Sequence, residues 1–142
     1  MKVAVVQFVK GKWSTGERVI LEKLGDQVSM TTMGEGFTWE TQDRQRDIAA
    51  ARNAWEQAKA FIMDDEHDVV LCDELNIVLR YDYLPLEEVL EVLASKPEMK
   101  HVIITGRNAK EDLIEAADLV TEMEMIKHPF RSGVKAQKGI EF

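Results

Sequence analysis

The chain has 142 residues, a hydrophobic fraction of 45% and one cysteine, which suits a single compact domain with a core and no internal disulfide. Its formal net charge of -8 disfavours a nucleic-acid or anionic-membrane partner, because like charge repels phosphate. The first apolar stretch is too short to span a bilayer, and it lacks the cleavage site of a secretory signal. We therefore expect a cytoplasmic protein that binds no nucleic acid and no membrane.

Short runs of apolar and β-branched residues predict the strands of a sheet. In chain order they are Val3 to Val9, Gln27 to Thr32, Val69 to Cys72, Val102 to Thr105 and, with a weaker pattern, Leu119 to Met123. The apolar residues follow one another without alternation, which is typical of strands buried on both faces of a parallel sheet. The run Gln27 to Thr32 is short and more polar, so we expect it at an edge.

Amphipathic patterns between these runs predict helices. The longest covers Thr41 to Met63, where apolar residues recur at three- and four-residue steps. A second helix, Leu86 to Ala94, follows a proline, which suits the first helical turn. A third, Ala109 to Ala116, follows Asn108, a residue type that suits an N-cap. Alternating strands and helices predict an α/β fold with a mostly parallel sheet flanked by helices.

Two adjacent carboxylates, Asp73 and Glu74, end the apolar run VVLCDEL. Ligands of open parallel sheets bind outside the carboxyl ends of the strands, where such acids can hold a magnesium ion beside a nucleotide phosphate. The pair resembles a Walker B element. The simpler alternative is that polar residues begin wherever a strand ends.

A second apolar run, HVIITGRN, ends in Gly106 and Arg107. The two runs should end at the same edge of the sheet, where glycine permits close backbone approach and arginine can present its donors to phosphate oxygens. The alternative is a turn glycine followed by a surface arginine. Two polar strand ends that face one crevice favour a nucleotide site more than either does alone.

The segment GEGFTWETQD places Phe37 and Trp39 two residues apart between glycines and polar residues. On an extended backbone both rings would point to the same side and form one apolar wall. The pattern alone favours the ordinary alternative, in which both rings fold back under the loop as a small satellite core.

Other polar residues carry no clear motif. The histidines at 67, 101 and 128 have no metal-ligand spacing. The acidic run between residues 64 and 68 is most simply a solvated connection from helix to strand.

Five blocks of the sequence follow one another in the order of a known family. They are QFVKGKW (Gln7 to Trp13), GFTWETQD (Gly36 to Asp43), LCDELNIVLRYDYLPLEEVL (Leu71 to Leu90), VIITGRNA (Val102 to Ala109) and HPFRSGVKAQKGIEF (His128 to Phe142). Together they closely resemble the corrinoid adenosyltransferases of the ATP:cob(I)alamin, P-loop type. The resemblance implies a P-loop NTPase-like, RecA-like fold and one domain over residues 1–142.

That family transfers the 5′-deoxyadenosyl group of ATP to the cobalt of a reduced corrinoid and so forms adenosylcobalamin and triphosphate. The resemblance implies ATP and a corrinoid as substrates, Mg²⁺ or Mn²⁺ at Asp73 and Glu74, a flavoprotein reductant and a homodimer. Phe37 and Trp39 match the family's aromatic loop, which occupies the lower face of the corrin and withholds an axial ligand from cobalt(II), so that the metal is easier to reduce. Arg107 as a phosphate contact is our own inference from its place in the sequence.

The chain departs from the family at its start. It contains no G-x-x-x-x-G-K-[ST] phosphate loop, and MKVAVVQF matches the family's second strand. We therefore expect an N-terminally truncated domain without the first strand and phosphate loop. Because that strand is usually interior, its loss should leave unpaired backbone groups and an exposed apolar face.

Three interpretations of this departure stay open. In the first, the start is an internal methionine of a complete adenosyltransferase. The chain could instead be a short paralogue that binds corrinoid without catalysis. Finally, it could be a generic P-loop-like nucleotide-binding fragment whose aromatic residues belong to the core.

Overall fold

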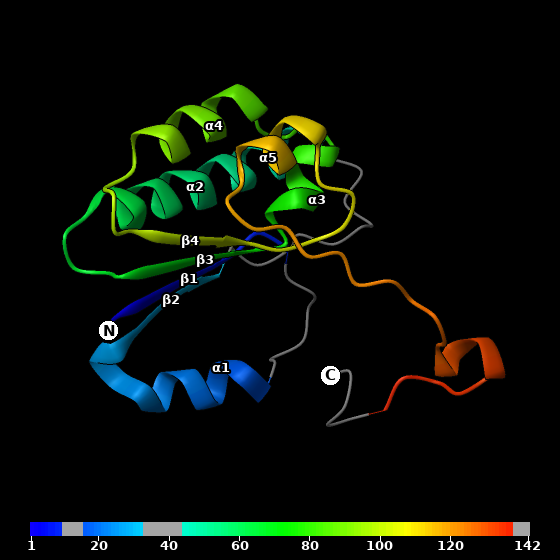
Figure 1. Ribbon diagram of the computed structural model, residues 1–142. Coiled ribbons are helices and arrows are strands. Elements are labelled where there is room, and N and C mark those ends of the chain that lie inside the picture. The colour runs from blue at the N-terminus through cyan, green and yellow to red at the C-terminus, as the bar shows by residue number, and fades with distance from the viewer. Residues whose placement is uncertain (10–15, 33–43, 138–142) are drawn as a thin grey trace.

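The computed structural model describes residues 1–9, 16–32 and 44–137 (Figure 1). Its elements in chain order are β1 (Val3–Gln7), α1 (Gly16–Leu21), the 3-10 helix η1 (Glu22–Gln27), β2 (Val28–Thr32), α2 (Arg44–Met63), β3 (Val69–Asp73), α3 (Leu75–Arg80), α4 (Leu86–Ser95), β4 (His101–Ile104), α5 (Glu111–Ala116) and the 3-10 helix η2 (Pro129–Ser132). Within these ranges, no helix is long and apolar enough to cross a membrane.

The described strands form one parallel sheet in the order β2-β1-β3-β4. The register pairs Val3 of β1 with Val28 of β2 and with Val69 of β3, and it pairs Val70 of β3 with Val102 of β4. The predicted α/β class and parallel sheet are confirmed. The more polar strand β2 lies at an edge, as its composition predicts.

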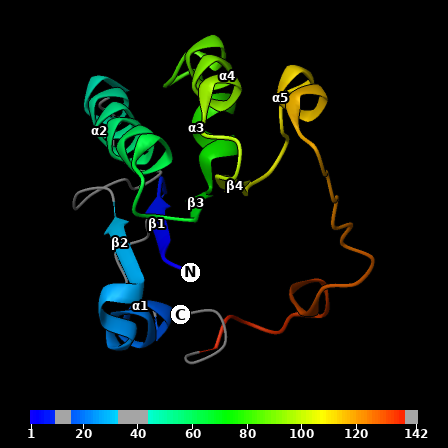
Figure 2. The same cartoon turned by 60° about the vertical axis from the view of Figure 1, so that its left-hand side comes forward.

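The core lies between one face of the sheet and the helices α2, α3, α4 and α5 (Figures 1 and 2). Alternate residues of β1 and β3 point into it, and Val6 and Cys72 are fully buried. The apolar face predicted for α2 packs against these residues through Trp55, Ala58 and Ile62, which are buried. Burying one large apolar side chain contributes roughly 1.5–3 kcal/mol, so this interface holds the sheet and its helices together.

The other face of the sheet is only partly covered, and among the described elements α1 is the helix on that side (Figure 1). In β3, buried residues alternate with half-buried ones, and Ile103 of β4 is 51% exposed. The prediction of strands buried on both faces therefore holds for β1, where Ala4 to Gln7 are all buried, and is wrong for β3 and β4.

The segment Leu119 to Met123 is not a strand, so that prediction is wrong. After α5 the chain leaves the sheet (Figure 1), and the side chains of Leu119 and Met123 are 85% and 92% exposed. A strand needs a neighbour with which to exchange backbone hydrogen bonds, and β4 pairs only with β3 among the described residues. A β-prone sequence without such a neighbour stays irregular.

Helix ends differ from the predictions by a few residues. The described part of the first long helix begins at Arg44, and residues 41–43 lie outside the described ranges. Helix α4 begins directly after Pro85, as predicted. Helix α5 begins after Lys110 instead of Asn108, because Asn108 adopts the left-handed conformation with φ 57°. Helices α1 and α3 were not predicted, since six residues are too few to show a helical period.

Candidate active site

The polar ends of β3 and β4 meet at one edge of the sheet, as the sequence predicted. The two strands run parallel in neighbouring positions, with Cys72 in register with Ile104. The ladder continues past β4, because the Thr105 N–H donates to the Cys72 carbonyl at 3.2 Å. The Asn76 N–H in turn donates to the Thr105 carbonyl at 3.2 Å. The start of α3 and the end of β4 are therefore fixed to each other beside the two carboxylates.

Thr105 holds both members of the acid pair. Its hydroxyl Oγ1 donates to Asp73 Oδ1 at 2.9 Å and accepts the Glu74 backbone N–H at 3.0 Å. One short side chain directly after β4 thus orients the Asp73 carboxylate and fixes the backbone turn that follows it. In the sequence, Thr105 is marked only as the end of an apolar run.

Glu74 occupies a strained and partly buried position. Its φ of 62° lies in the left-handed region, which costs free energy for a residue with a side chain. Burial, and then the charge of Asp73, raise the pKa of the Glu74 carboxyl, whereas the charge of Arg107 opposes the rise. One carboxyl oxygen, Oε2, is buried and has no hydrogen-bond partner. A positive charge beside this oxygen would lower the pKa of the carboxyl and give Oε2 the partner that it lacks.

Gly106 leaves room for this arrangement. Its φ of 128° is accessible to glycine and strained for other residues. A Cβ at this position would lie 2.8 Å from Asn76 Cβ and 3.3 Å from Glu74 Oε2. The glycine that the sequence placed beside Arg107 therefore serves close packing of the strand end against the acid pair, and Arg107 itself is exposed at the surface.

These oxygens fit a magnesium-type cation. The described residues contain no group of three or more histidine, cysteine, aspartate or glutamate side chains that could hold a metal. Mg²⁺ does not need one, because it is usually bound through one or two carboxylates together with waters and substrate phosphates. Asp73 and Glu74 supply that number, and the unpartnered Glu74 Oε2 is an available ligand atom.

The ends of β1 and β2 reach the same edge. Gln7 is in register with both Asp73 and Thr32, and the Thr32 hydroxyl donates to Gln7 Oε1 at 3.3 Å. Thr32, the last residue of β2, therefore lies at the edge that carries the acid pair. The residues Asp73, Glu74, Asn76 and Thr105 lie at this edge, and we name them the carboxyl-edge site.

The predicted corrinoid residues Phe37 and Trp39 lie in the segment 33–43 and outside the described residues. The segment returns at Arg44, the first described residue of α2. Arg44 donates to the Tyr81 carbonyl at 3.4 Å, and its guanidinium lies 5.7 Å from the centre of the Tyr83 ring. Both attachment points of the segment are therefore defined.

Comparison with known proteins decides the family. The model of the family described as "ATP:corrinoid adenosyltransferase BtuR/CobO/CobP" matches residues 1–142. The chain belongs to this family. A corrinoid adenosyltransferase of Sinorhizobium sp. is 63% identical over all of this chain, which spans 67% of that protein. Those of Pseudomonas aeruginosa and Escherichia coli K12 are 54% and 50% identical, over 100% and 99% of this chain and over 70% and 71% of their own lengths.

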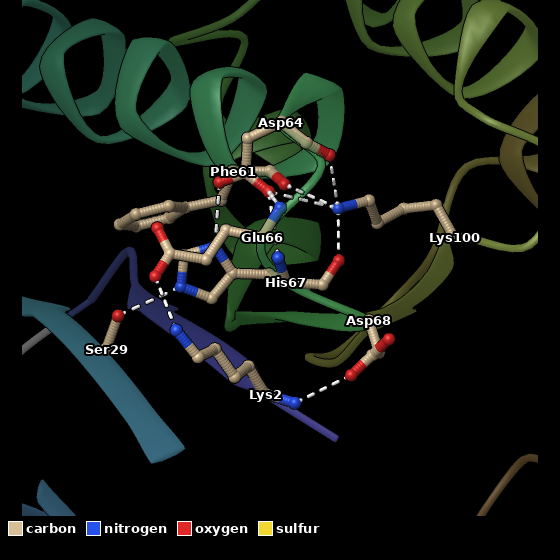
Figure 3. Close-up of polar contacts among 8 residues, drawn as sticks. All are labelled: Lys2, Ser29, Phe61, Asp64, Glu66, His67, Asp68 and Lys100. Carbon is tan, nitrogen blue, oxygen red and sulfur yellow. Dashed lines mark hydrogen bonds and ion pairs between the residues drawn. The ribbon is translucent and has the colours of Figure 1, made fainter. Parts of the chain in front are cut away.

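A second polar group of this adenosyltransferase-family chain lies at the opposite edge of the sheet (Figure 3). We name Asp64, His67 and Lys100 the amino-edge cluster, because they precede β3 and β4. Lys100 is 5% exposed and donates to the backbone carbonyls of Asp64, His67 and Phe61. His67 is also buried, with Nδ1 2.7 Å from Asp64 Oδ2 and Nε2 2.9 Å from Ser29 Oγ.

The amino-edge cluster corrects the prediction that the acidic run is merely solvated. Burial alone would raise the pKa of Asp64, yet hydrogen bonds from His67 and Lys100 hold that pKa well below its usual range. Glu66 pairs with the Lys2 ammonium at 2.6 Å, and Asp68 accepts the Lys2 backbone N–H at 2.7 Å. The run thus ties the start of β1 and the start of β4 to the end of α2.

The remaining histidines lie elsewhere. His101 is exposed at the start of β4. His128 precedes η2, and its Nδ1 accepts the Phe130 N–H at 3.1 Å. The predicted site residues Asp73, Glu74 and Arg107 are therefore brought to one edge of the fold, and the histidines are not.

Proposed function

We propose that this chain transfers the 5′-deoxyadenosyl group of ATP to the cobalt of a reduced corrinoid, forming adenosylcobalamin and triphosphate. One observation carries the proposal: a chain that matches the corrinoid adenosyltransferase family over residues 1–142 keeps a partly buried acid pair at the carboxyl edge of its parallel sheet. That edge is where open α/β sheets bind their ligands. The relatives named above support the same activity.

On the nucleotide side, we propose that Asp73 and Glu74 hold Mg²⁺ or Mn²⁺. When bound, the cation would offset the negative charge that grows on the triphosphate leaving group. Thr105 keeps the Asp73 carboxylate oriented. Arg107 is exposed at the same strand end, where its guanidinium can contact phosphate oxygens.

On the corrinoid side, we propose that Phe37 and Trp39 cover the lower face of the macrocycle. Aromatic rings offer cobalt no lone pair, so they leave cobalt(II) without an axial ligand and make its reduction easier. Cobalt(I) then attacks C5′ of the ribose. The cobalt–carbon bond forms as the bond from C5′ to the triphosphate oxygen breaks, and triphosphate carries away the electron pair. The attachment of segment 33–43 at Thr32 supports this role, because Thr32 shares an edge with the acid pair.

Three further features belong to the proposal. Cobalt(I) is reached only by reduction, so we propose a flavoprotein as electron donor. We propose a homodimer, which would cover part of the exposed apolar surface, and a cytoplasmic location. We also propose that residues 1–142 act as one domain.

Paired alanine substitutions test the corrinoid role. Phe37→Ala with Trp39→Ala should strongly impair reduction of a cobalt(II) corrinoid by reduced flavin, because a solvent ligand could then reach cobalt. ATP affinity should change little. The visible spectrum follows the reduction and the formation of adenosylcobalamin, and ATP binding is titrated separately. Phe130→Ala is the matched control, because Phe130 is an exposed aromatic residue outside the proposed site.

The same titrations separate the other interpretations. An unchanged cobalt(II) spectrum with saturating unmodified protein would refute corrinoid binding and leave a nucleotide-binding fragment. A changed spectrum without adenosylcobalamin in the presence of ATP would refute catalysis and leave a corrinoid-binding paralogue.

A further inference from the structure

Asn76 places a second unpartnered oxygen at the carboxyl-edge site. It is the second residue of α3 and is 8% exposed, and its Oδ1 is buried without a hydrogen-bond partner. Among the described residues, the buried side-chain atoms without a partner are Trp55 Nε1, Glu74 Oε2 and Asn76 Oδ1. Buried polar atoms are nearly always paired, so two orphaned oxygens at one site require a reason.

The surrounding contacts fix Asn76 beside the acid pair. Its backbone N–H donates to the carbonyl of Thr105, whose hydroxyl holds Asp73. Asn76 Cβ and Glu74 Oε2 both lie close to the point where a Gly106 Cβ would be, at 2.8 Å and 3.3 Å. The asparagine and the glutamate therefore pack against the same glycine, where a side chain would collide with Asn76.

The chemistry of the orphaned atoms selects their ligand. Both are oxygens with free lone pairs, and neither can satisfy the other in the ionised state because both are acceptors. Hard divalent cations take carboxylate and amide oxygens as ligands. An amide oxygen also adds a ligand atom without adding a third negative charge next to Asp73 and Glu74.

We infer that Asn76 Oδ1 is a further oxygen ligand for the divalent cation at Asp73 and Glu74, an inference that rests on the proposed function. In this arrangement Thr105 sets the direction of the aspartate. Gly106, which has no side chain, allows Asn76 and Glu74 to lie close together against the end of β4. The amide oxygen raises the affinity of the site for the cation, and the carboxylates of Asp73 and Glu74 supply the negative charge that balances it.

Two substitutions at position 76 separate a ligand from a structural residue. Asn76→Leu keeps the approximate size and removes the oxygen, whereas Asn76→Asp keeps an oxygen in the same place. Mn²⁺ alone is titrated into each full chain, and the free ion is followed by electron paramagnetic resonance. Asn76→Leu should weaken Mn²⁺ binding by about 10-fold to 100-fold, while Asn76→Asp should bind at least as tightly as the unmodified chain. Asp73→Asn is measured in parallel, and thermal unfolding without metal reports the stability of each variant.

The outcomes distinguish this inference from the function on which it rests. Equal Mn²⁺ affinity of Asn76→Leu and the unmodified chain, with binding lost in Asp73→Asn, would overturn the role of Asn76 and leave the acid pair as the metal site. Equal weakening in both Asn76 variants would also overturn it, since a purely structural residue predicts that result. Absence of Mn²⁺ binding by the unmodified chain would refute the metal role of the acid pair itself, and this inference with it.

Discussion

The two edges of the sheet carry polar groups of opposite character. At the amino edge, the Lys100 ammonium is saturated by backbone carbonyls and by Asp64, and both ring nitrogens of His67 have partners (Figure 3). At the carboxyl edge, Glu74 and Asn76 each keep a buried oxygen without a partner. Each group combines buried residues (His67 and Lys100 at one edge, Asn76 at the other) with half-buried ones, so burial does not explain the difference.

The difference separates polar groups that hold the fold from those that serve a ligand. A buried polar group whose hydrogen bonds are all made keeps the folded state stable. A buried oxygen without a partner lowers the stability of the folded state by about 1–3 kcal/mol. A protein that retains that cost at one edge, next to a strained glutamate, is organised to bind something there. The comparison therefore supports a structural role for the amino edge and the proposed cation-binding role of the carboxyl edge.

Removing the buried ammonium group of Lys100 should have the largest effect on stability. Lys100→Met would leave three carbonyls and part of the Asp64 carboxylate without their donor. We expect a loss of about 3–5 kcal/mol in the free energy of unfolding, measured by urea titration. Lys59→Met is the matched control, because the Lys59 ion pair with Glu56 lies at the surface and should contribute under about 1 kcal/mol. Equal losses in the two variants would break the assignment of the amino edge as a structural cluster.

Substitution of Thr105 should have a smaller effect on stability and should mainly lower the rate of adenosyl transfer. Thr105→Val removes the donor to Asp73 Oδ1 and the acceptor of the Glu74 N–H. We expect the adenosyl-transfer rate to fall by about 10-fold to 100-fold, as is usual when a group that orients a metal ligand is lost. Thr105→Ser retains the hydroxyl and should recover most of the rate. If serine and valine behave alike, the hydroxyl does not orient the site.

The sequence predicted the parts of this fold that depend on local patterns. Apolar runs located β1, β3 and β4, and the polar character of residues 27–32 placed β2 at an edge. The carboxylates of Asp73 and Glu74 were found because they end a strand, and parallel strands end together. The same rule brought Arg107 to their edge.

Other parts depend on contacts between distant residues, and no local pattern marks them. Lys100 binds mainly backbone carbonyls about 35 residues earlier in the chain, and a carbonyl has no sequence signature. The role of Thr105 appears only when β3 lies beside it. The apolar run at 119–123 looks like a strand, yet a strand also needs a neighbour, which local sequence does not specify.

Ligand-induced stabilisation tests the central claim, that the unpaired oxygens of the carboxyl edge serve a cation and its nucleotide. The melting temperature of the chain is measured with and without saturating Mn²⁺ and ATP, for the unmodified protein and for Asp73→Asn. Because a ligand at one hundred times its Kd adds about 2.7 kcal/mol to the stability of the native state, the unmodified protein should melt several degrees higher. Asp73→Asn should show little or no rise. The same rise in both proteins, or none in the unmodified protein, would contradict the account.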